Sequence, residues 1–167
     1  MKFATQALAP AVAALLLVAS PLQAQVFPRG NGISLTDKDT FDMYVQINDW
    51  RDMRQDMDSF RLTTLRMFEQ DLQEQGIRRR PGRSLLVCNV QAVRNRSQIF
   101  YNTTIEYWEL ESTKVNWLQW AQSGLNIIAA NKFNEALVAE ECASRFVAEW
   151  NRWNPVEEDD LYYNDYN

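Results

Sequence analysis

The sequence predicts an α+β domain: an antiparallel or mixed sheet of about four strands, with two helices on one of its faces. Three observations lead to this fold class. One segment alternates apolar and polar residues with a period of two, and later segments are rich in β-branched and aromatic residues, as strands are. Two further segments carry a single apolar stripe at helical spacing. A sheet with both helices on one side buries both stripes.

The first strand and the first helix occupy the front half of the predicted domain. Residues 41–48 alternate between apolar and polar side chains. The side chains expected to be buried are those of Phe41, Met43, Val45 and Ile47. Asp58 or Ser59 can cap the helix that follows, and Gly76 stands where a helix commonly ends. The apolar stripe of this helix comprises Leu62, Leu65, Phe68 and Leu72.

Three more strands follow the first helix. Their β-branched and aromatic content predicts strands over residues 85–93 and 99–110. A third strand over 115–122 follows a four-residue hairpin loop, Glu111 to Lys114. Gly124 interrupts this strand, and the residues after it prolong the strand beyond a bulge. With a final helix, the order of elements is β-α-β-β-β-α.

The last helix, residues 133–153, ends before Pro155 and is linked to the sheet by the two cysteines of the chain. Cys142 lies on its apolar stripe, and Cys88 lies on the apolar face of the strand 85–93. In an oxidising compartment a single pair of cysteines most simply forms a disulfide. This bridge would stabilise the fold by roughly 4 kcal/mol in the chain-entropy model. A redox pair or a metal site is the alternative, and the sequence offers neither a Cys-x-x-Cys motif nor a histidine for it.

The front of the chain predicts export. A basic residue, an apolar alanine-rich run and a small residue at Ala24 follow the order of a cleavable secretory signal over residues 1–24. A membrane anchor is the rival interpretation, but the run is shorter than the ~20 apolar residues that a spanning helix needs. We therefore expect an exported protein, periplasmic or secreted, with no transmembrane segment in the mature chain.

The rest of the chain divides into three parts. Residues 25–40 hold Pro and Gly among polar groups and predict an N-terminal arm. Residues 41–155 form the single α+β domain. Residues 156–167 are acidic and rich in tyrosine, which predicts a disordered tail.

Composition narrows the possible functions. The chain contains no histidine, the commonest general base and metal ligand, and no glycine-rich phosphate loop. We therefore expect no cofactor, no metal site and no catalytic activity. The 17 Lys and Arg against 22 Asp and Glu give a formal net charge of −5, which argues against nucleic-acid binding.

An aromatic pair is the leading candidate for a ligand or partner site. If Glu111 to Lys114 form the hairpin loop, Trp108 lies opposite Trp117, with Cβ atoms about 5 Å apart. Both rings would lie on the outer face of the sheet, with Glu106 and Gln119 beside them. The face toward the helices would carry Ile99, Tyr101, Ile105, Tyr107, Leu118 and Trp120. Such a pair can stack on a sugar, a peptide or a partner's side chain, or it can simply stabilise the sheet.

The glutamates of one strand and the arginines around another complete the set of candidate site residues. Glu106, Glu109 and Glu111 are the nearest approach to a carboxylate cluster, although exposed strand glutamates usually only solvate a face. The arginines flank the strand 85–93 in two groups about 30 Å apart, too distant to form one basic patch. These groups are Arg78, Arg79, Arg80 and Arg83 before the strand, and Arg94 and Arg96 after it. Ordinary solvated loop residues are the favoured interpretation of both groups, and anion binding is the alternative. An acidic tail folded back on the first group is a third possibility.

The order of elements over residues 41–153 resembles that of a group of bacterial envelope accessory proteins. This group includes the lipopolysaccharide-transport lipoprotein of the outer membrane and the amino-terminal domain of the Tol-system periplasmic protein. The resemblance concerns topology, so no site residue is carried over, and it implies a binding or assembly role. We therefore expect an exported, non-catalytic binding or envelope-assembly protein with a protein or glycan partner. A subunit of a larger periplasmic or outer-membrane assembly is the second hypothesis, and a carboxylate-dependent hydrolase is the third.

Overall fold

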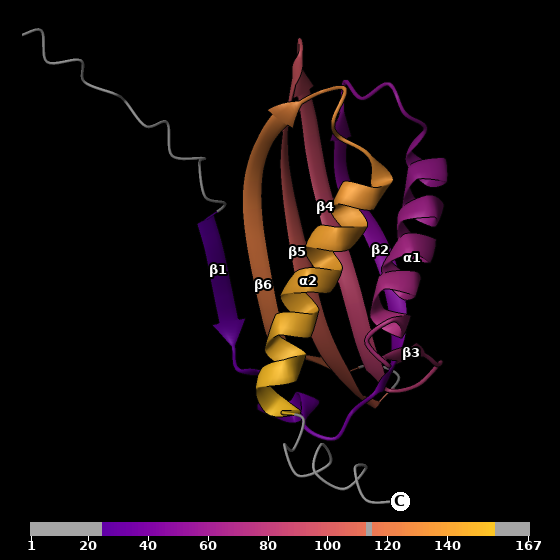
Figure 1. The fold of residues 1–167 in the computed structure, drawn as a ribbon, viewed down its shortest axis with the longest axis vertical. Coiled ribbons are helices and arrows are strands. Elements are labelled where there is room, and N and C mark those ends of the chain that lie inside the picture. The colour runs from indigo at the N-terminus through magenta and orange to yellow at the C-terminus, as the bar shows by residue number, and fades with distance from the viewer. Residues whose placement is uncertain (1–24, 113–114, 156–167) are drawn as a thin grey trace, which may run out of the picture.

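The structure, a computed structural model, describes residues 25–112 and 115–155 (Figure 1). The predicted signal peptide, the predicted tail and the last two residues of the predicted loop lie outside this range. The elements are, in chain order, β1 (Gln25–Gly30), the 3-10 helix η1 (Gly32–Leu35), β2 (Thr40–Arg51), α1 (Met57–Gln73), β3 (Arg78–Arg79), β4 (Ser84–Asn95), β5 (Gln98–Ser112), β6 (Val115–Ala129) and α2 (Glu135–Trp153).

The predicted fold class is confirmed, but the sheet is larger than expected. Within the described residues it has six strands in the order β1-β6-β5-β4-β2-β3, two more than about four. Strand β2 pairs in parallel with β3 and β4, because α1 carries the chain back before β4 begins. The pairs β4–β5, β5–β6 and β1–β6 are antiparallel, so the sheet is mixed.

The first additional strand, β1, comes from the segment predicted to be an arm. Its residues pair with β6 from Gln25 opposite Leu125 to Gly30 opposite Trp120. Gly30 has a φ of 75°, and a Cβ there would lie 2.3 Å from the backbone oxygen of Gln119. The glycine therefore permits a close approach of two strands, whereas in the sequence it suggested a linker. The second additional strand, β3, is only two residues long.

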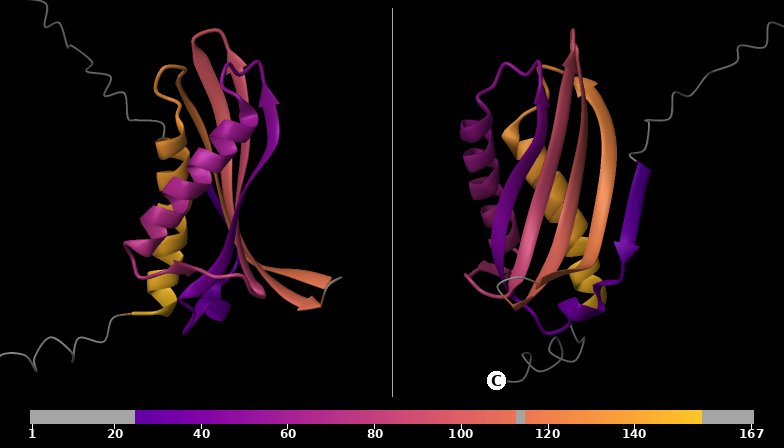
Figure 2. Two further views of the ribbon diagram at one scale, coloured as in Figure 1. Left: turned by 90° about the vertical axis from the view of Figure 1, so that its right-hand side faces the viewer. Right: turned by 180° about the vertical axis from the view of Figure 1, so that it is seen from behind.

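Both helices lie on one face of the sheet, as predicted (Figure 2). Helix α1 starts earlier than expected, because Asp56 is the N-cap and accepts a hydrogen bond of 2.8 Å from the amide of Ser59. Its buried side chains are Phe60, Thr64, Phe68 and Leu72, so the buried stripe is rotated relative to the predicted one. Leu62 was expected to be buried and is 50% exposed.

The core lies between the helices and the sheet and contains the disulfide. Cys88 on β4 and Cys142 on α2 are both fully buried, with sulfur atoms 2.03 Å apart. The structure therefore joins the two cysteines that the sequence paired. Phe41 packs edge-on against Tyr107 of β5 and Phe146 of α2, with ring centroids 5.7 and 5.3 Å apart. Aromatic contacts thus connect three elements at the centre of the fold.

A polar network, called here the α2 clamp, lies between α2 and the sheet beside the disulfide. It comprises Tyr101, Thr103, Asn126, Glu141 and Arg145. Tyr101 and Thr103 donate hydrogen bonds of 2.6 and 2.8 Å to the Glu141 carboxylate, which Asn126 also contacts. Arg145 pairs with Glu141 at 3.1 Å and donates to the backbone oxygen of Thr103. Burial, followed by the bond to the carboxylate, raises the pKa of Tyr101.

Gly124 makes room for this network. A Cβ at this position would lie 2.3 Å from Nη2 of Arg145. The glycine that the sequence suggested would interrupt the last strand therefore lies within a continuous β6 and admits the guanidinium group.

The segment after β1 is held against the C-terminal end of α2. The Gly32 amide donates a hydrogen bond of 3.0 Å to the carboxylate of Glu149, which is 7% exposed. The Asp37 amide donates to Asn154 at 2.7 Å, and the Trp150 indole donates to the backbone oxygen of Lys38. These contacts place Lys38 beside the end of α2, next to β5. Among the described residues, no helix combines the length and the apolar character that crossing a bilayer requires.

Candidate ligand-binding site

A bulge in the β5–β6 hairpin decides which side chains share a face. Tyr107 pairs with Trp120, but the next pair is Trp108 with Leu118, so β6 has one more residue than β5 at this point. Glu109 then lies opposite Trp117. Because side chains alternate along a strand, one extra residue exchanges the two faces of β6 beyond the bulge.

The predicted pairing of Trp108 with Trp117 is therefore wrong. Trp108 is half-buried on the outer face, and its indole donates a hydrogen bond of 2.8 Å to Glu106. Trp117 is 57% exposed and points to the side that carries Tyr107 and Glu109. Leu118, expected to face the helices, is 38% exposed on the outer face instead. The other five side chains predicted to face the helices are all buried.

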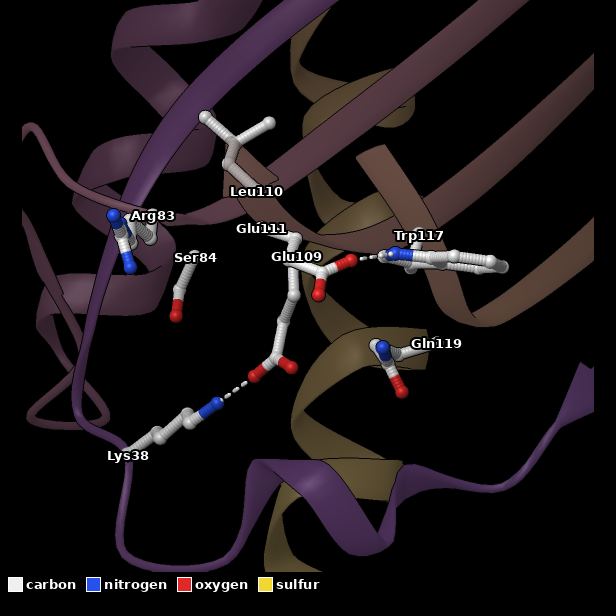
Figure 3. A pocket seen from close by; sticks show the side chains of 8 residues that line it. All are labelled: Lys38, Arg83, Ser84, Glu109, Leu110, Glu111, Trp117 and Gln119. Atoms are coloured by element: carbon white, nitrogen blue, oxygen red, sulfur yellow. Dashed lines mark hydrogen bonds and ion pairs between the residues drawn. The ribbon is translucent and has the colours of Figure 1, made fainter. Parts of the chain in front are cut away.

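Trp117 lines an open hollow of about 540 Å³. Figure 2 shows that β5 and β6, which contribute to its lining, bend away from the helices at this end of the sheet. We call this hollow the pole pocket. It is formed by three segments that lie far apart in the sequence: the end of the former arm, the start of β4, and the β5–β6 hairpin. Its lining residues, drawn in Figure 3, are Lys38, Arg83, Ser84, Glu109, Leu110, Glu111, Trp117 and Gln119.

An ion pair between Lys38 and Glu109 forms one wall of the pocket. Lys38 also donates a hydrogen bond of 2.6 Å to the Tyr107 hydroxyl, which in turn donates one of 2.7 Å to Glu109. The hydrogen bond from Lys38 lowers the pKa of Glu109 below its ordinary value of 4.5. Burial alone would lower the pKa of Lys38, but the bonds to Glu109 and Tyr107 outweigh it and raise this pKa above 10.5. Both groups therefore stay charged at neutral pH and hold each other.

The other wall combines an aromatic ring with free polar groups. The Trp117 indole donates a hydrogen bond of 2.7 Å to one carboxylate oxygen of Glu111 (Figure 3). The amide of Gln119 lies beside this pair. Arg83 is exposed and carries no ion pair to another described residue, while its backbone oxygen accepts a hydrogen bond of 2.8 Å from Leu110. The two cations and two carboxylates of the pocket give it a net formal charge near zero.

The structure brings together only part of the predicted site. Trp117 and Gln119 line the pole pocket, whereas Trp108 and Glu106 bond to each other on the opposite face. Glu109 and Glu111 share the pocket, as their spacing of two residues in one strand predicted, and Glu106 points away. Lys38 and Arg83 were missed as members of the site. Lys38 lay in the supposed arm, and no sequence signal indicated that this segment contacts β5.

No protein-family model and no curated protein matches this chain. Among solved structures, it is similar to a PelC dodecamer from Paraburkholderia phytofirmans, with 12% identity and a TM-score of 0.47 over 76% of this chain and 96% of that one. A single-substitution variant of the same dodecamer also has 12% identity, with a TM-score of 0.48 over 72% of this chain and 92% of that one. These comparisons show no family. The function of the chain is therefore inferred from its own residues.

Proposed function

We propose that this chain is an exported, non-catalytic binding protein and that the pole pocket is its binding site for a glycan. Export rests on the signal pattern of residues 1–24, which lie outside the described range. The single observation that carries the binding role is Trp117: a large aromatic side chain, 57% exposed, that donates a hydrogen bond to Glu111 and is surrounded by polar groups.

The chemistry of the pocket fits a sugar ring better than an aliphatic or strongly charged ligand. The apolar face of a pyranose can stack on an exposed indole, while its hydroxyls need donors and acceptors around the ring edge. Gln119 and Ser84 supply both kinds of group, Arg83 supplies donors, and the second oxygen of Glu111 supplies an acceptor. The open shape of the hollow and its balanced charge favour an extended, neutral ligand.

The carboxylates of the pocket support binding over catalysis. Hydrolysis by a carboxylate pair needs one group that holds a proton at working pH. The ion pair to Lys38 lowers the pKa of Glu109, and Glu111 is engaged with the Trp117 indole. Glu106 lies on the other face of the sheet. This arrangement supports a role for the two carboxylates of the pocket in positioning other side chains: Glu109 pairs with Lys38, and Glu111 accepts a hydrogen bond from Trp117.

A glycan array probed with the purified protein tests this proposal. We expect retention of neutral oligosaccharides, and loss of that retention in Trp117→Ala. Trp108→Ala is the matched control, because it removes the same side chain from the opposite face of the same hairpin. The proposal fails if no glycan is retained, or if both variants bind as the unchanged protein does. Circular dichroism of each variant separates a lost site from a lost fold.

A second function, as a subunit of a larger envelope assembly, is supported by the outer face of the sheet. Phe100 and Ile127 lie opposite each other on β5 and β6 and are 36% and 52% exposed. Leu125, two residues before Ile127 on the same face, is 57% exposed. Large apolar side chains that adjoin one another on an open sheet face are typical of protein contacts.

Sedimentation velocity tests this second function. An assembly role predicts a mass above that of the monomer, and a return toward the monomer in Leu125→Ser with Ile127→Ser. Ile33→Ser is the control, since Ile33 is 58% exposed but lies on η1, away from the sheet face. A monomer at all concentrations would remove this hypothesis and leave the glycan proposal standing.

A further inference from the structure

Another open hollow, of about 510 Å³, lies at the opposite end of β4 from the pole pocket. Ser84 at the start of β4 lines the pole pocket and Arg94 near its end lines this hollow, so the two residues lie about 30 Å apart along the strand. The β4–β5 turn and the segment that joins β6 to α2 form the hollow (Figure 1). The Ala130 amide links these two segments by donating a hydrogen bond of 2.8 Å to the backbone oxygen of Ser97. We call it the turn hollow, and its lining residues are Arg94, Ser97, Gln98, Ala129, Ala130 and Asn131.

Arg94 differs from the other half-buried basic residues of the described chain. Four basic side chains there are half-buried, those of Lys38, Arg61, Arg94 and Arg145. Three of the four pair with a carboxylate: Lys38 with Glu109, Arg61 with Asp58, and Arg145 with Glu141. Arg94 forms no ion pair with another described residue. It is therefore a half-buried cation whose charge is not matched within the part of the chain that the structure describes.

The place of Arg94 in the fold explains why the missing partner matters. Side chains alternate along β4, so Arg94 lies on the helix-facing side of the strand with Cys88, Val90 and Ala92, which are fully buried. Its Nε donates a hydrogen bond of 3.0 Å to the backbone oxygen of Arg96, which leaves the two terminal nitrogens, Nη1 and Nη2, for another partner. A cation that is partly removed from water is stabilised by an opposite charge. The turn hollow is the space in which Arg94 can meet such a charge.

The other polar side chains of the turn hollow suit an anionic ligand as well. Ser97, Gln98 and Asn131 each bring a hydrogen-bond donor. Among the described residues that line the hollow there is no Asp or Glu, whereas the pole pocket holds two carboxylates beside its two cations. A guanidinium group forms two parallel hydrogen bonds with a carboxylate or a phosphate, which a neutral ligand does not offer. The volume of the hollow lies within the range of about 300–1,000 Å³ that is typical of small-molecule sites.

We propose that the turn hollow binds a small ligand through a carboxylate or phosphate group, with the terminal nitrogens of Arg94 paired to the anion. Ser97, Gln98 and Asn131 donate hydrogen bonds to the remaining oxygens of the ligand. This site goes beyond the glycan proposal, because it lies at the other end of the sheet and selects its ligand by charge. The net charge of −5 opposes a general accumulation of anions at the surface of the protein. Saturable binding of an anion therefore requires a local cation such as Arg94.

Titration of the purified protein with glucuronate, and separately with inorganic phosphate, tests this inference by ¹H–¹⁵N NMR at constant ionic strength. Glucose is the neutral comparison, because it has the ring of glucuronate without the carboxylate. We expect saturable shifts of the Arg94 Nε resonance and of the Ser97 and Gln98 amides with at least one of the two anions, and none with glucose. The anion that binds more tightly identifies carboxylate or phosphate as the preferred group. The inference is overturned if neither anion gives a saturable shift, or if glucose shifts the same resonances equally.

Variants of Arg94 test whether its guanidinium group holds the anion. Arg94→Gln should weaken binding by about tenfold or more, because it removes charge-assisted hydrogen bonds. Arg94→Lys keeps the charge without the planar fork and should bind with intermediate affinity. Arg66→Gln is the matched control, since Arg66 is an exposed arginine on α1 that bonds to Thr63 and does not line the hollow. Equal weakening by Arg66→Gln and Arg94→Gln would overturn the inference, because binding would then follow the overall charge. Trp117→Ala should leave anion binding unchanged, so this outcome is separate from that of the glycan array.

Discussion

Two polar clusters lie against the same β5–β6 ribbon and differ in what covers them. In the α2 clamp, both oxygens of the Glu141 carboxylate accept hydrogen bonds from the sheet, and α2 lies above them. In the pole pocket, the ribbon runs past the end of the helices. Glu109 pairs there with Lys38, and Glu111 accepts one hydrogen bond from the exposed Trp117. The remaining polar groups of the pocket face an open hollow.

The difference teaches how to separate a structural cluster from a candidate site. The side chains of Glu141 and Arg145 are 19% and 11% exposed, whereas those of Glu109 and Lys38 are 35% and 31% exposed. Groups that are more deeply buried cost more when they lose a partner, and solvent screens the others. The clamp therefore serves mainly stability, whereas the pocket leaves polar groups and an aromatic ring exposed to solvent. Three predictions test this contrast.

The largest effect is expected from the disulfide beside the clamp. Replacing Cys88 and Cys142 together by serine should lower the free energy of unfolding by about 2–4 kcal/mol, because the bridge closes a loop of 54 residues in the unfolded chain. Urea denaturation followed by far-UV circular dichroism measures this change. The reduced, unmodified protein should show the same loss. An unchanged denaturation midpoint would show that the bridge does not stabilise the fold.

An intermediate effect is expected within the clamp. Glu141→Ala leaves Arg145 largely buried without its carboxylate partner and removes the acceptor of Tyr101 and Thr103, so it should cost about 2 kcal/mol of stability. The neighbouring Glu140 is exposed, and Glu140→Ala should cost less than about 0.5 kcal/mol. Equal losses in the two variants, again by urea denaturation, would contradict a structural role for the network.

The smallest effect is expected in the pocket. Lys38→Met should cost less than about 1 kcal/mol at neutral pH, as exposed ion pairs do. Because pairing lowers the pKa of Glu109 below 4.5, its contribution is complete above that pH and disappears as the pH falls through the lowered value. The raised pKa of Lys38 limits the contribution only above pH 10.5.

Urea denaturation over a pH series checks this prediction. The difference in stability between the unchanged protein and Lys38→Met should be constant near neutrality and shrink in acid. Lys132→Met, which removes an exposed lysine elsewhere, should show no such dependence. A difference that persists unchanged in strong acid would mean that Lys38 acts through packing and not through its charge.

Much of the fold followed from patterns within single segments. The alternation at Phe41 to Ile47 predicted a strand, and the apolar stripe through Cys142 predicted the inner face of the last helix, both as observed. Leu62 shows the limit of the same reasoning. Its spacing of three from Leu65 suits a helical stripe, but the observed stripe has a spacing of four and runs from Phe60 through Thr64 to Phe68, which leaves Leu62 outside it.

The candidate site was predicted only in part, because its geometry depends on distant contacts. Trp117 was singled out as an aromatic residue in a hairpin, but it was assigned to the wrong face. One extra residue in β6 reverses the faces beyond it, and no local pattern announces which residue is extra. Gly30 and Gly32 suggested a linker, yet they allow the close contacts that bring Lys38 to the pocket.

The sequence by itself determined the fold class, both helices, the four long strands of the central domain and the pairing of the two cysteines. The helices and strands depend on the period and type of neighbouring residues, and the pairing follows from there being only two cysteines. Only the tertiary structure decided that β1 joins the sheet beside β6, that Trp117 lies on the same side as Glu109, and that Arg83 lines the same pocket. These outcomes depend on the register and the close approach of segments distant in the chain, which are properties of packing and not of local sequence.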